Sequence, residues 1–441
     1  MKKIILVLLS WSLLVSVPSG LEARLTPKRS VLQNGMVLLT SEERALPMVT
    51  LNLLIKAGSR YDPQGREGLA NLTARLLTYG TSGRTALQIS EEIDFIGAGL
   101  SAGCGEELAT VSLTVLKKDL DIGLNILADI LTASVFPPEE IDRQKQSVIA
   151  SIRARDEEPG AIAETKFLEA LFPRSPYGRP VEGTKETVQR IERTELLRFY
   201  KQFYRPNRAL LAVVGDVSDQ EITEKLVKVF RSWERGTAAE EPVPSVSAGP
   251  ANFIRVQKDL TQANIIIGHE GVPRNHPDYY AIQVMNYILG GGGFSSRLMD
   301  SVRNERGLAY SVYSTFDADK YVGTFQVGMQ TKNESADEAI RIAVEEIRRI
   351  REQGVGGQEL QAAKDYLIGS FPLRFDTNRR LAGFFAQVEF FELGLDYPDR
   401  YPEMIRKVSR EDVLRVAKRY LQPEKLIVVV VANQEKTGVK K

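Results

Sequence analysis

The chain has 441 residues, in which 58 Lys and Arg balance 57 Asp and Glu, and 43% of the residues are hydrophobic. This near-neutral balance gives no reason to expect a nucleic acid or a polyanionic surface as partner. The composition is typical of a globular protein and leaves room for two or more domains.

The first residues have the pattern of a secretory signal peptide, which we place at residues 1–23. Two lysines precede the apolar run Ile4–Val17, and Gly20 or Ala23 supplies a small residue at which the signal ends. The run is too short for a spanning helix, although an uncleaved membrane anchor is the alternative. We therefore expect export across an inner membrane, to the periplasm.

Cys104 is the only cysteine, so no internal disulfide can form. It lies within Gly99–Gly105, and we interpret it as a small packed residue. A reactive thiol is the less favoured alternative, because no histidine that could activate it occurs before His269.

The spacing of apolar residues predicts the elements of the first half of the chain. Alternation predicts a lead strand and turn over Arg24–Glu42. Three further strands are predicted over Val49–Lys56, Leu108–Leu116 and Ala209–Val214. Helical spacing, with its start and stop residues, predicts helices over Gly68–Thr81 (ending at Gly80), Ser90–Gly97, Lys118–Thr132, Pro137–Asp156 and Thr194–Phe203.

The second half of the chain repeats the first. The segment that begins Arg193-Thr-Glu-Leu-Leu-Arg matches Arg410-Glu-Asp-Val-Leu-Arg, and Pro206 matches Pro423 at the same offset. Glu140 matches Glu359 at almost that offset. Two regions that match at nearly one offset indicate two copies of one domain.

Between the copies, residues 237–250 are rich in Pro, Ala, Ser and Glu and have the character of a linker. We therefore predict homologous domains at residues 24–236 and 251–441. Each would be a mixed, mainly antiparallel sheet covered by helices, in an α+β fold with a groove between the halves.

Several short motifs, spread over nearly the whole chain after the signal, together resemble the pitrilysin/insulinase family of zinc peptidases in its short, mitochondrial-processing type. They are Ala57-Gly58-Ser59-Arg60, Gly65–Ala70, Tyr79-Gly80-Thr81, Tyr204-Arg205-Pro206-Asn207, Val214-Gly215-Asp216 and Gly290–Tyr310. The resemblance implies a clamshell, of which this chain would form one half.

In active members of that family, the helix after Gly-Leu-Ala carries H-x-x-E-H, two zinc ligands and the glutamate that activates the metal-bound water. The matching positions here are Asn71, Ala74 and Arg75, and the third ligand, a glutamate in the family, falls at Ser151. Arg75 is a permanent cation that repels Zn²⁺, and Ala74 cannot accept a proton. The resemblance therefore implies a chain without a metal site or catalytic residues of its own.

A relocated metal site would have to use His269 and His276, the only two histidines, with Glu270 and Asp278 nearby. We favour the alternative that both histidines are surface residues of a polar loop.

The run Gly290–Gly293 raises the question of a nucleotide loop. We reject it, because Ile282–Leu289 is predicted to be a helix rather than a strand and no lysine follows the glycines. Glycines also let a backbone approach a peptide or a neighbouring subunit closely. Gly291 and Gly292 are accordingly our candidates for substrate binding.

The family's second functional pair, an Arg and a Tyr seven residues apart, matches Arg303 and Tyr310, after a helix predicted over Ser295–Arg306. The resemblance implies that Arg303 holds a peptide carbonyl or carboxylate and that Tyr310 donates to the oxyanion formed at the scissile bond. Spacing alone would favour a solvated charge and a core aromatic residue, but the surrounding motifs favour the functional interpretation.

The resemblance thus implies a non-catalytic, substrate-binding subunit of a heterodimeric zinc endopeptidase, with zinc in a homologous partner and Arg303 and Tyr310 acting in trans on a peptide. A peptide-binding or scaffold protein with no proteolytic role is the alternative. An enzyme active by itself is a third possibility, which stoichiometric zinc in the isolated chain would support.

Overall fold

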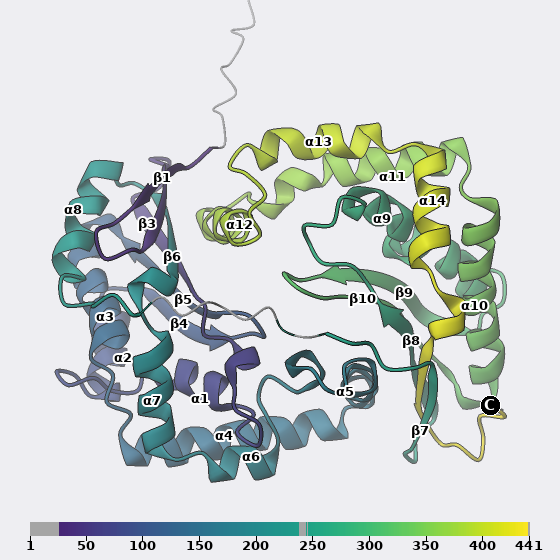
Figure 1. The fold of residues 1–441 in the computed structure, drawn as a ribbon, viewed down its shortest axis with the longest axis horizontal. Helices are drawn as coiled ribbons and strands as arrows, with labels where there is room; N and C mark the ends of the chain where they lie inside the picture. Colours follow the sequence, from purple (N-terminus) through teal and green to yellow (C-terminus); the bar gives the residue numbers. More distant parts are fainter. Residues whose placement is uncertain (1–25, 238–243, 245, 440–441) are drawn as a thin grey trace, which may run out of the picture.

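The computed structural model describes residues 26–237, 244 and 246–439, which form two halves, each built around one β-sheet (Figure 1). The first sheet has six strands in the order β1-β2-β6-β3-β5-β4. Its strands are β1 (Lys28–Val31), β2 (Val37–Glu42), β3 (Met48–Ile55), β4 (Gly99–Cys104), β5 (Ala109–Leu116) and β6 (Ala209–Gly215).

The second sheet has five strands in the order β7-β11-β8-β10-β9. Its strands are β7 (Asn252–Gln257), β8 (Gln262–Glu270), β9 (Ala309–Ala318), β10 (Gly323–Lys332) and β11 (Ile427–Ala432). It repeats the first sheet without β1: β6 pairs parallel to β2, β11 pairs parallel to β7, and the other pairs are antiparallel. The mixed, mainly antiparallel sheets predicted from the sequence are confirmed.

Helices of the first half cover one face of its sheet and form the first hydrophobic core with it. They are α1 (Leu69–Leu76), α2 (Ala86–Phe95), α3 (Leu120–Thr132), α4 (Pro138–Glu157), α6 (Lys185–Arg190), α7 (Arg193–Phe203) and α8 (Asp219–Val229); α5 (Pro159–Leu171) has a different role. Their starts follow from local chemistry. Thr85, for example, caps α2 in a reciprocal capping box with Gln88, and α4 begins at Pro138 with two glutamates in its first turn.

The second half has the corresponding helices and its own core. They are α9 (Tyr279–Asn286), α10 (Ala336–Gln353), α11 (Gly357–Gly369), α12 (Asn378–Phe390), α13 (Tyr397–Lys407) and α14 (Arg410–Tyr420). Helices α7 and α14 have equal lengths and begin at Arg193 and Arg410, the two residues matched in the sequence repeat.

The two halves exchange one helix each, as Figure 1 shows. Helix α5 leaves the first half and packs on β8 and β11 of the second sheet, while α12 leaves the second half and packs on β3 and β6 of the first. Phe167 on α5 lies so close to β8 that a side chain at Gly268 would come within 2.8 Å of its ring. Each sheet is therefore buried on both faces, and one face of each depends on the other half.

The first sheet contains one strand, β4, that the sequence did not predict. Cys104 is its last residue and packs against the first core. Burial raises the pKa of the Cys104 thiol well above its usual value, which is the opposite of what a reactive thiol needs. The proposed signal peptide, residues 1–23, and half of the linker at 237–250 (238–243 and 245) lie outside the described residues. Within the described parts of the chain, no helix combines the length and the apolar character needed to span a membrane.

The helix exchange makes a prediction about stability. Phe167 on α5 is fully buried, whereas Phe95 at the end of α2 is 90% exposed. Phe167→Ala should lower the free energy of unfolding by about 3–5 kcal/mol, because it opens a cavity between the halves. The matched change Phe95→Ala should cost less than about 0.5 kcal/mol. Urea unfolding followed by circular dichroism measures both, and similar losses for the two variants would contradict the role assigned to α5.

Candidate functional site

Helix α1 occupies the place where the sequence suggested a degenerate zinc motif, and it ends at Leu76, earlier than Gly80. Gly68, with a φ of 95°, precedes it, and a side chain there would meet the carbonyl of Glu182 at 2.5 Å. The carboxylate of Asp62 caps the helix by accepting from the backbone N–H groups of Gly68 and Ala70, each at 2.8 Å. Burial nevertheless raises the pKa of Asp62 to about 7.

Three of the four degenerate positions lie on α1, and the fourth lies on α4, which packs against it. Asn71 and Ala74 are buried, and the side-chain amide nitrogen of Asn71 has no hydrogen-bond partner within the described residues. Arg75 points toward α4, where its Nε is 3.5 Å from Oε1 of Gln144, a long contact. Ser151 is exposed, and its hydroxyl donates to the carbonyl of Ser147 at 3.1 Å.

These side chains cannot do the chemistry of a zinc peptidase. Asn71 and Ser151 offer only neutral oxygens, Ala74 offers a methyl group, and Arg75 brings a fixed positive charge. Among the residues that the structure describes, no group of three or more His, Cys, Asp and Glu side chains is arranged to hold a metal ion. That this chain binds no metal stays a prediction. Zinc analysis of the pure protein tests it.

The glycine run Gly290–Gly293 begins inside a π-helical turn, Tyr287–Gly291, and ends at a 3-10 turn, Gly293–Ser295; a second π-helical turn follows at Met299–Asn304. A side chain at Gly290 would meet the backbone nitrogen of Ser314 on β9 at 2.4 Å. The close approach that glycine allows here is therefore internal, between a helix end and a strand. Gly291 is exposed and Gly292 half-exposed, and their binding of substrate stays a prediction.

Arg303 and Tyr310 come together with a third residue, Phe294. The guanidinium carbon of Arg303 lies 4.8 Å from the ring centre of Phe294 and 5.2 Å from that of Tyr310, both within reach of a cation–π contact. The two rings are 72% and 79% exposed. Tyr310 is thus no core aromatic residue. We call Phe294, Arg303 and Tyr310 the aromatic–arginine cluster.

Two backbone irregularities shape this cluster. Arg303 lies in the second π-helical turn, a kind of distortion that often occurs at functional sites. Tyr310 lies at a β-bulge in the edge strand β9: Ala309 pairs with Thr331 and Ser311 with Gln330, so Tyr310 has no opposite residue. A bulge re-aims the side chain at its site. Sequence reasoning missed Phe294, although an aromatic residue directly after four glycines was a usable signal.

Comparison with known proteins places these features in a family. Residues 37–185 match the family described as Insulinase (Peptidase family M16), and residues 190–367 match the one described as Peptidase M16 inactive domain. An uncharacterized zinc protease of Rickettsia bellii is 30% identical over 413 residues, which cover 92% of this chain and 97% of the relative. The chain belongs to the insulinase family, peptidase family M16.

Relatives in the M16 family differ in the activity their names imply. The Helicobacter pylori protein named "Non-peptidase homolog YmxG" is 26% identical over 430 residues, or 96% of this chain and 98% of the relative. The crystal structure of a peptidase M16 inactive domain from Pseudomonas fluorescens superposes with a TM-score of 0.86 at 26% identity, over 92% of this chain and 97% of that chain. These comparisons are consistent with a non-catalytic M16 member.

The two histidines of this M16 chain have different surroundings, and the expectation that both are surface residues was wrong for His269. His269 is no surface residue but a buried residue of β8, with 2% exposure. Its Nε2 accepts from the backbone N–H of Gln422 at 3.1 Å, which leaves Nδ1 to donate to the carbonyl of Glu270 at 2.7 Å. His276 instead contacts the hydroxyl of Tyr420 through Nε2. Both ring nitrogens of His269 are used by the backbone, so it is not poised as a ligand.

The burial of His269 predicts a pH dependence of stability. Burial lowers the pKa of His269 to about 4, against about 6.5 in an unfolded chain. Between these values the unfolded state binds more protons, so the contribution of neutral His269 to stability is complete above pH 6.5 and is lost as the pH falls toward 4. From pH 7.5 to pH 5, the wild type should lose about 2 kcal/mol more than His269→Gln.

Urea unfolding of both proteins at the two pH values measures this difference. Burial raises the pKa values of Asp62 and Glu107 to about 7, so these groups change the stability with pH in the opposite direction. Because both proteins contain them, their contribution cancels in the comparison. Parallel pH profiles would show that His269 is protonated as easily in the folded state as in the unfolded one.

Proposed function

We propose that this chain is the non-catalytic, substrate-binding subunit of a heterodimeric zinc endopeptidase of the M16 family. In this proposal a homologous partner holds the zinc ion, and this chain supplies Arg303 and Tyr310 in trans. The complex would act on extended peptides in the periplasm, after removal of the signal at residues 1–23.

The exposed aromatic–arginine cluster is the observation that carries the proposal. Arg303 is held by two rings and by the sulfur of Met299, 4.0 Å from its Nη1, and forms no ion pair with a carboxylate within the described residues. Its fork is therefore available for a carbonyl or carboxylate oxygen of a peptide. A cation with no carboxylate partner among the described residues is the state expected of a group that acts on a ligand.

Tyr310 suits the second role in this proposal. Its ring is 79% exposed on the edge strand β9, so its hydroxyl can reach a substrate bound between this chain and a partner. A hydroxyl that donates to a developing oxyanion contributes most when a partner surface excludes water around it. An edge strand also offers backbone groups to an extended peptide.

The loss of the zinc motif on α1 supports assigning the metal to another chain. The peptide-binding pair is retained while Asn71, Ala74, Arg75 and Ser151 replace the metal-binding and base positions. The relative named as a non-peptidase homolog supports a chain without peptidase activity of its own.

The proposal is tested by isolating the protein from its native cell envelope and identifying what co-purifies by mass spectrometry. We expect a homologue with an intact H-x-x-E-H helix, near one copy per copy of this chain. Recovery of this chain alone would overturn the heterodimer and favour a scaffold or peptide-binding protein with no proteolytic role.

In the complex, Arg303→Ala should lower kcat/KM for a peptide at least tenfold, and Tyr310→Phe should lower it about 100-fold, the loss typical of one oxyanion donor. Arg306→Ala is the matched control, because Arg306 is already engaged by Glu305 and by the carbonyl of Ser301. It should stay within about twofold of the wild type. Zinc content, measured in parallel, should be unchanged in all three variants. Normal cleavage by Arg303→Ala would refute the role of the pair.

A further inference from the structure

Two arginines occupy the same position in the two repeats, and only one has a carboxylate partner. Arg60 follows β3 and Arg274 follows β8. The backbone N–H of Arg60 donates to the carbonyl of Glu106 at 3.0 Å, and that of Arg274 donates to the carbonyl of Asp319 at 2.8 Å. The two loops are thus built alike, and the side chains can be compared directly.

Arg60 is neutralised within the chain. Its Nε lies 3.0 Å from Oε2 of Glu107, and the two side chains are 4% and 6% exposed. The rings of Tyr61 and Tyr321 stack on the guanidinium, with ring centres 4.4 Å and 4.9 Å away. A buried cation with a carboxylate and two aromatic faces needs no further partner.

Arg274 lacks such a carboxylate. Its guanidinium donates to the hydroxyl of Tyr397 at 2.8 Å and lies over the rings of Tyr279, Tyr397 and Tyr280, at 3.8, 5.5 and 5.9 Å. Within the part of the chain that the structure describes, it forms no ion pair with an acidic group. Glu107 directly follows Glu106, whereas the residue that follows Asp319 is Lys320, a cation that pairs with Glu392. A half-buried positive charge is therefore left to a ligand.

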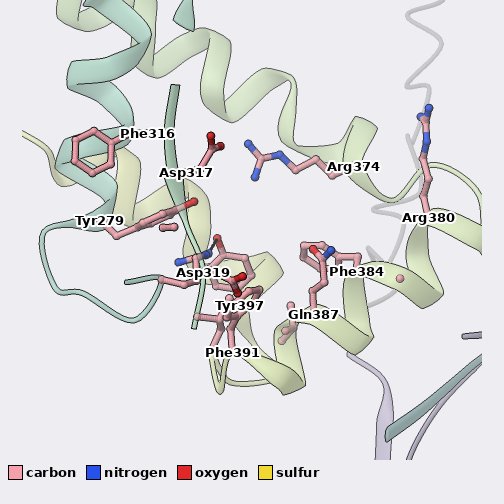
Figure 2. A pocket seen from close by; sticks show the side chains of 15 residues that line it. Tyr279, Phe316, Asp317, Asp319, Arg374, Arg380, Phe384, Gln387, Phe391 and Tyr397 are labelled. Atoms are coloured by element: carbon pink, nitrogen blue, oxygen red, sulfur yellow. Dashed lines mark hydrogen bonds between the residues drawn. The ribbon is translucent and has the colours of Figure 1, made fainter. Parts of the chain in front are cut away.

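Arg274 lines a pocket of about 730 Å³ between the end of β9 and helices α12 and α13. Figure 2 shows Arg374 reaching into this hollow toward Asp317, with the rings of Phe316 and Phe384 on its walls. Arg374 is exposed, and its described contacts are stacking contacts with Phe371 and Tyr401, each at 5.5 Å. The volume suits a few residues of peptide or a small molecule.

The charges in the pocket select among ligands. Of the three arginines that line the pocket, Arg380 is paired with Asp376, whereas Arg274 and Arg374 offer forked donors to a carboxylate. The aromatic walls suit an apolar side chain. Asp317 and Asp319 line the same pocket and would repel the dense negative charge of a phosphate, but their oxygens can accept from a peptide N–H. A single carboxylate joined to an amide and an apolar side chain fits this pattern.

We propose that the pocket binds the C-terminal carboxylate of a peptide whose last residue is apolar or aromatic, with Arg274 and Arg374 holding the carboxylate. The site is separate from the aromatic–arginine cluster and does not depend on a zinc-bearing partner. Its failure and the failure of the proposed function are therefore distinguishable, because this test uses the isolated chain.

Calorimetric titration of the isolated chain with N-acetyl-Ala-Gly-Phe, and with the same peptide as its C-terminal amide, tests the proposal. We expect the free acid to bind at least tenfold more tightly than the amide, because the amide cannot accept two charge-assisted hydrogen bonds. Equal binding of the two peptides, or no binding of either, would overturn it.

Variants identify the residues involved. Arg374→Gln should weaken binding of the free acid about tenfold, and Arg274→Lys, which keeps the charge but loses the fork, should weaken it at least fivefold. Arg379→Gln changes the net charge equally at an exposed arginine outside the pocket, and it should stay within twofold of the wild type. Thermal unfolding verifies that each variant is folded. Undiminished binding by Arg374→Gln and Arg274→Lys would refute the assignment.

Inorganic phosphate provides the last arm of the test. It should not displace the peptide at equal concentration, because two carboxylates line the pocket. If phosphate displaces the peptide at a concentration below that of the peptide, the pocket is a phosphate site and not a site for a peptide carboxylate.

Discussion

The reciprocal exchange of α5 and α12 is the contact on which the rest of this structure depends. Each sheet has one face covered by helices of its own half and one face covered by a single helix from the other. Residues of β11 show the division: Val428 and Val430 belong to the core of the second half, whereas Ile427, Val429 and Val431 pack with α5. Neither half could bury both faces of its sheet alone, so the exchange makes two repeats into one folded unit.

The same exchange positions the functional features. Helix α12 crosses toward the first sheet and forms a wall of the pocket beside Arg274, while the loop after β9 brings Tyr321 onto Arg60. Where the first repeat has the neutralising carboxylate of Glu107, the second has Lys320, which is paired elsewhere. The two copies thus differ in which arginine has a carboxylate partner among the described residues, although the loops that carry Arg60 and Arg274 are built alike.

Sequence reasoning found the features that local pattern encodes and missed those that distant contacts create. The repeat, the helix α7 with its counterpart α14, and the strands β3, β5 and β6 follow from apolar spacing. Helix α5 was not predicted, although Ala163, Phe167 and Leu171 have helical spacing; that these residues pack on the sheet of the other half could not be predicted from local pattern. Strand β4, at a sheet edge, does alternate Leu100, Ala102 and Cys104 with Gly and Ser, but small residues make the alternation weak and favour no strand.

The candidate site shows the same limit. The spacing of Arg303 and Tyr310 was visible in the sequence, but their meeting with Phe294 depends on two π-helical turns and a β-bulge that no residue pattern announces. His269 was misplaced on the surface because its loop-like neighbours hid a strand whose burial comes from β10 and β11. Burial of a polar residue is decided by tertiary packing, which a single sequence reports only indirectly.

The place of β11 in the second sheet has a consequence for how the molecule forms. This strand is the last one in chain order, yet it lies between β7 and β8, and β6 is inserted between β2 and β3 in the same way. A growing polypeptide therefore cannot close the second sheet until nearly all of it has left the ribosome, and α5 has no complete surface to dock on before then. Such high contact order implies slow folding and a long interval in which both sheets are incomplete and their apolar faces stay uncovered.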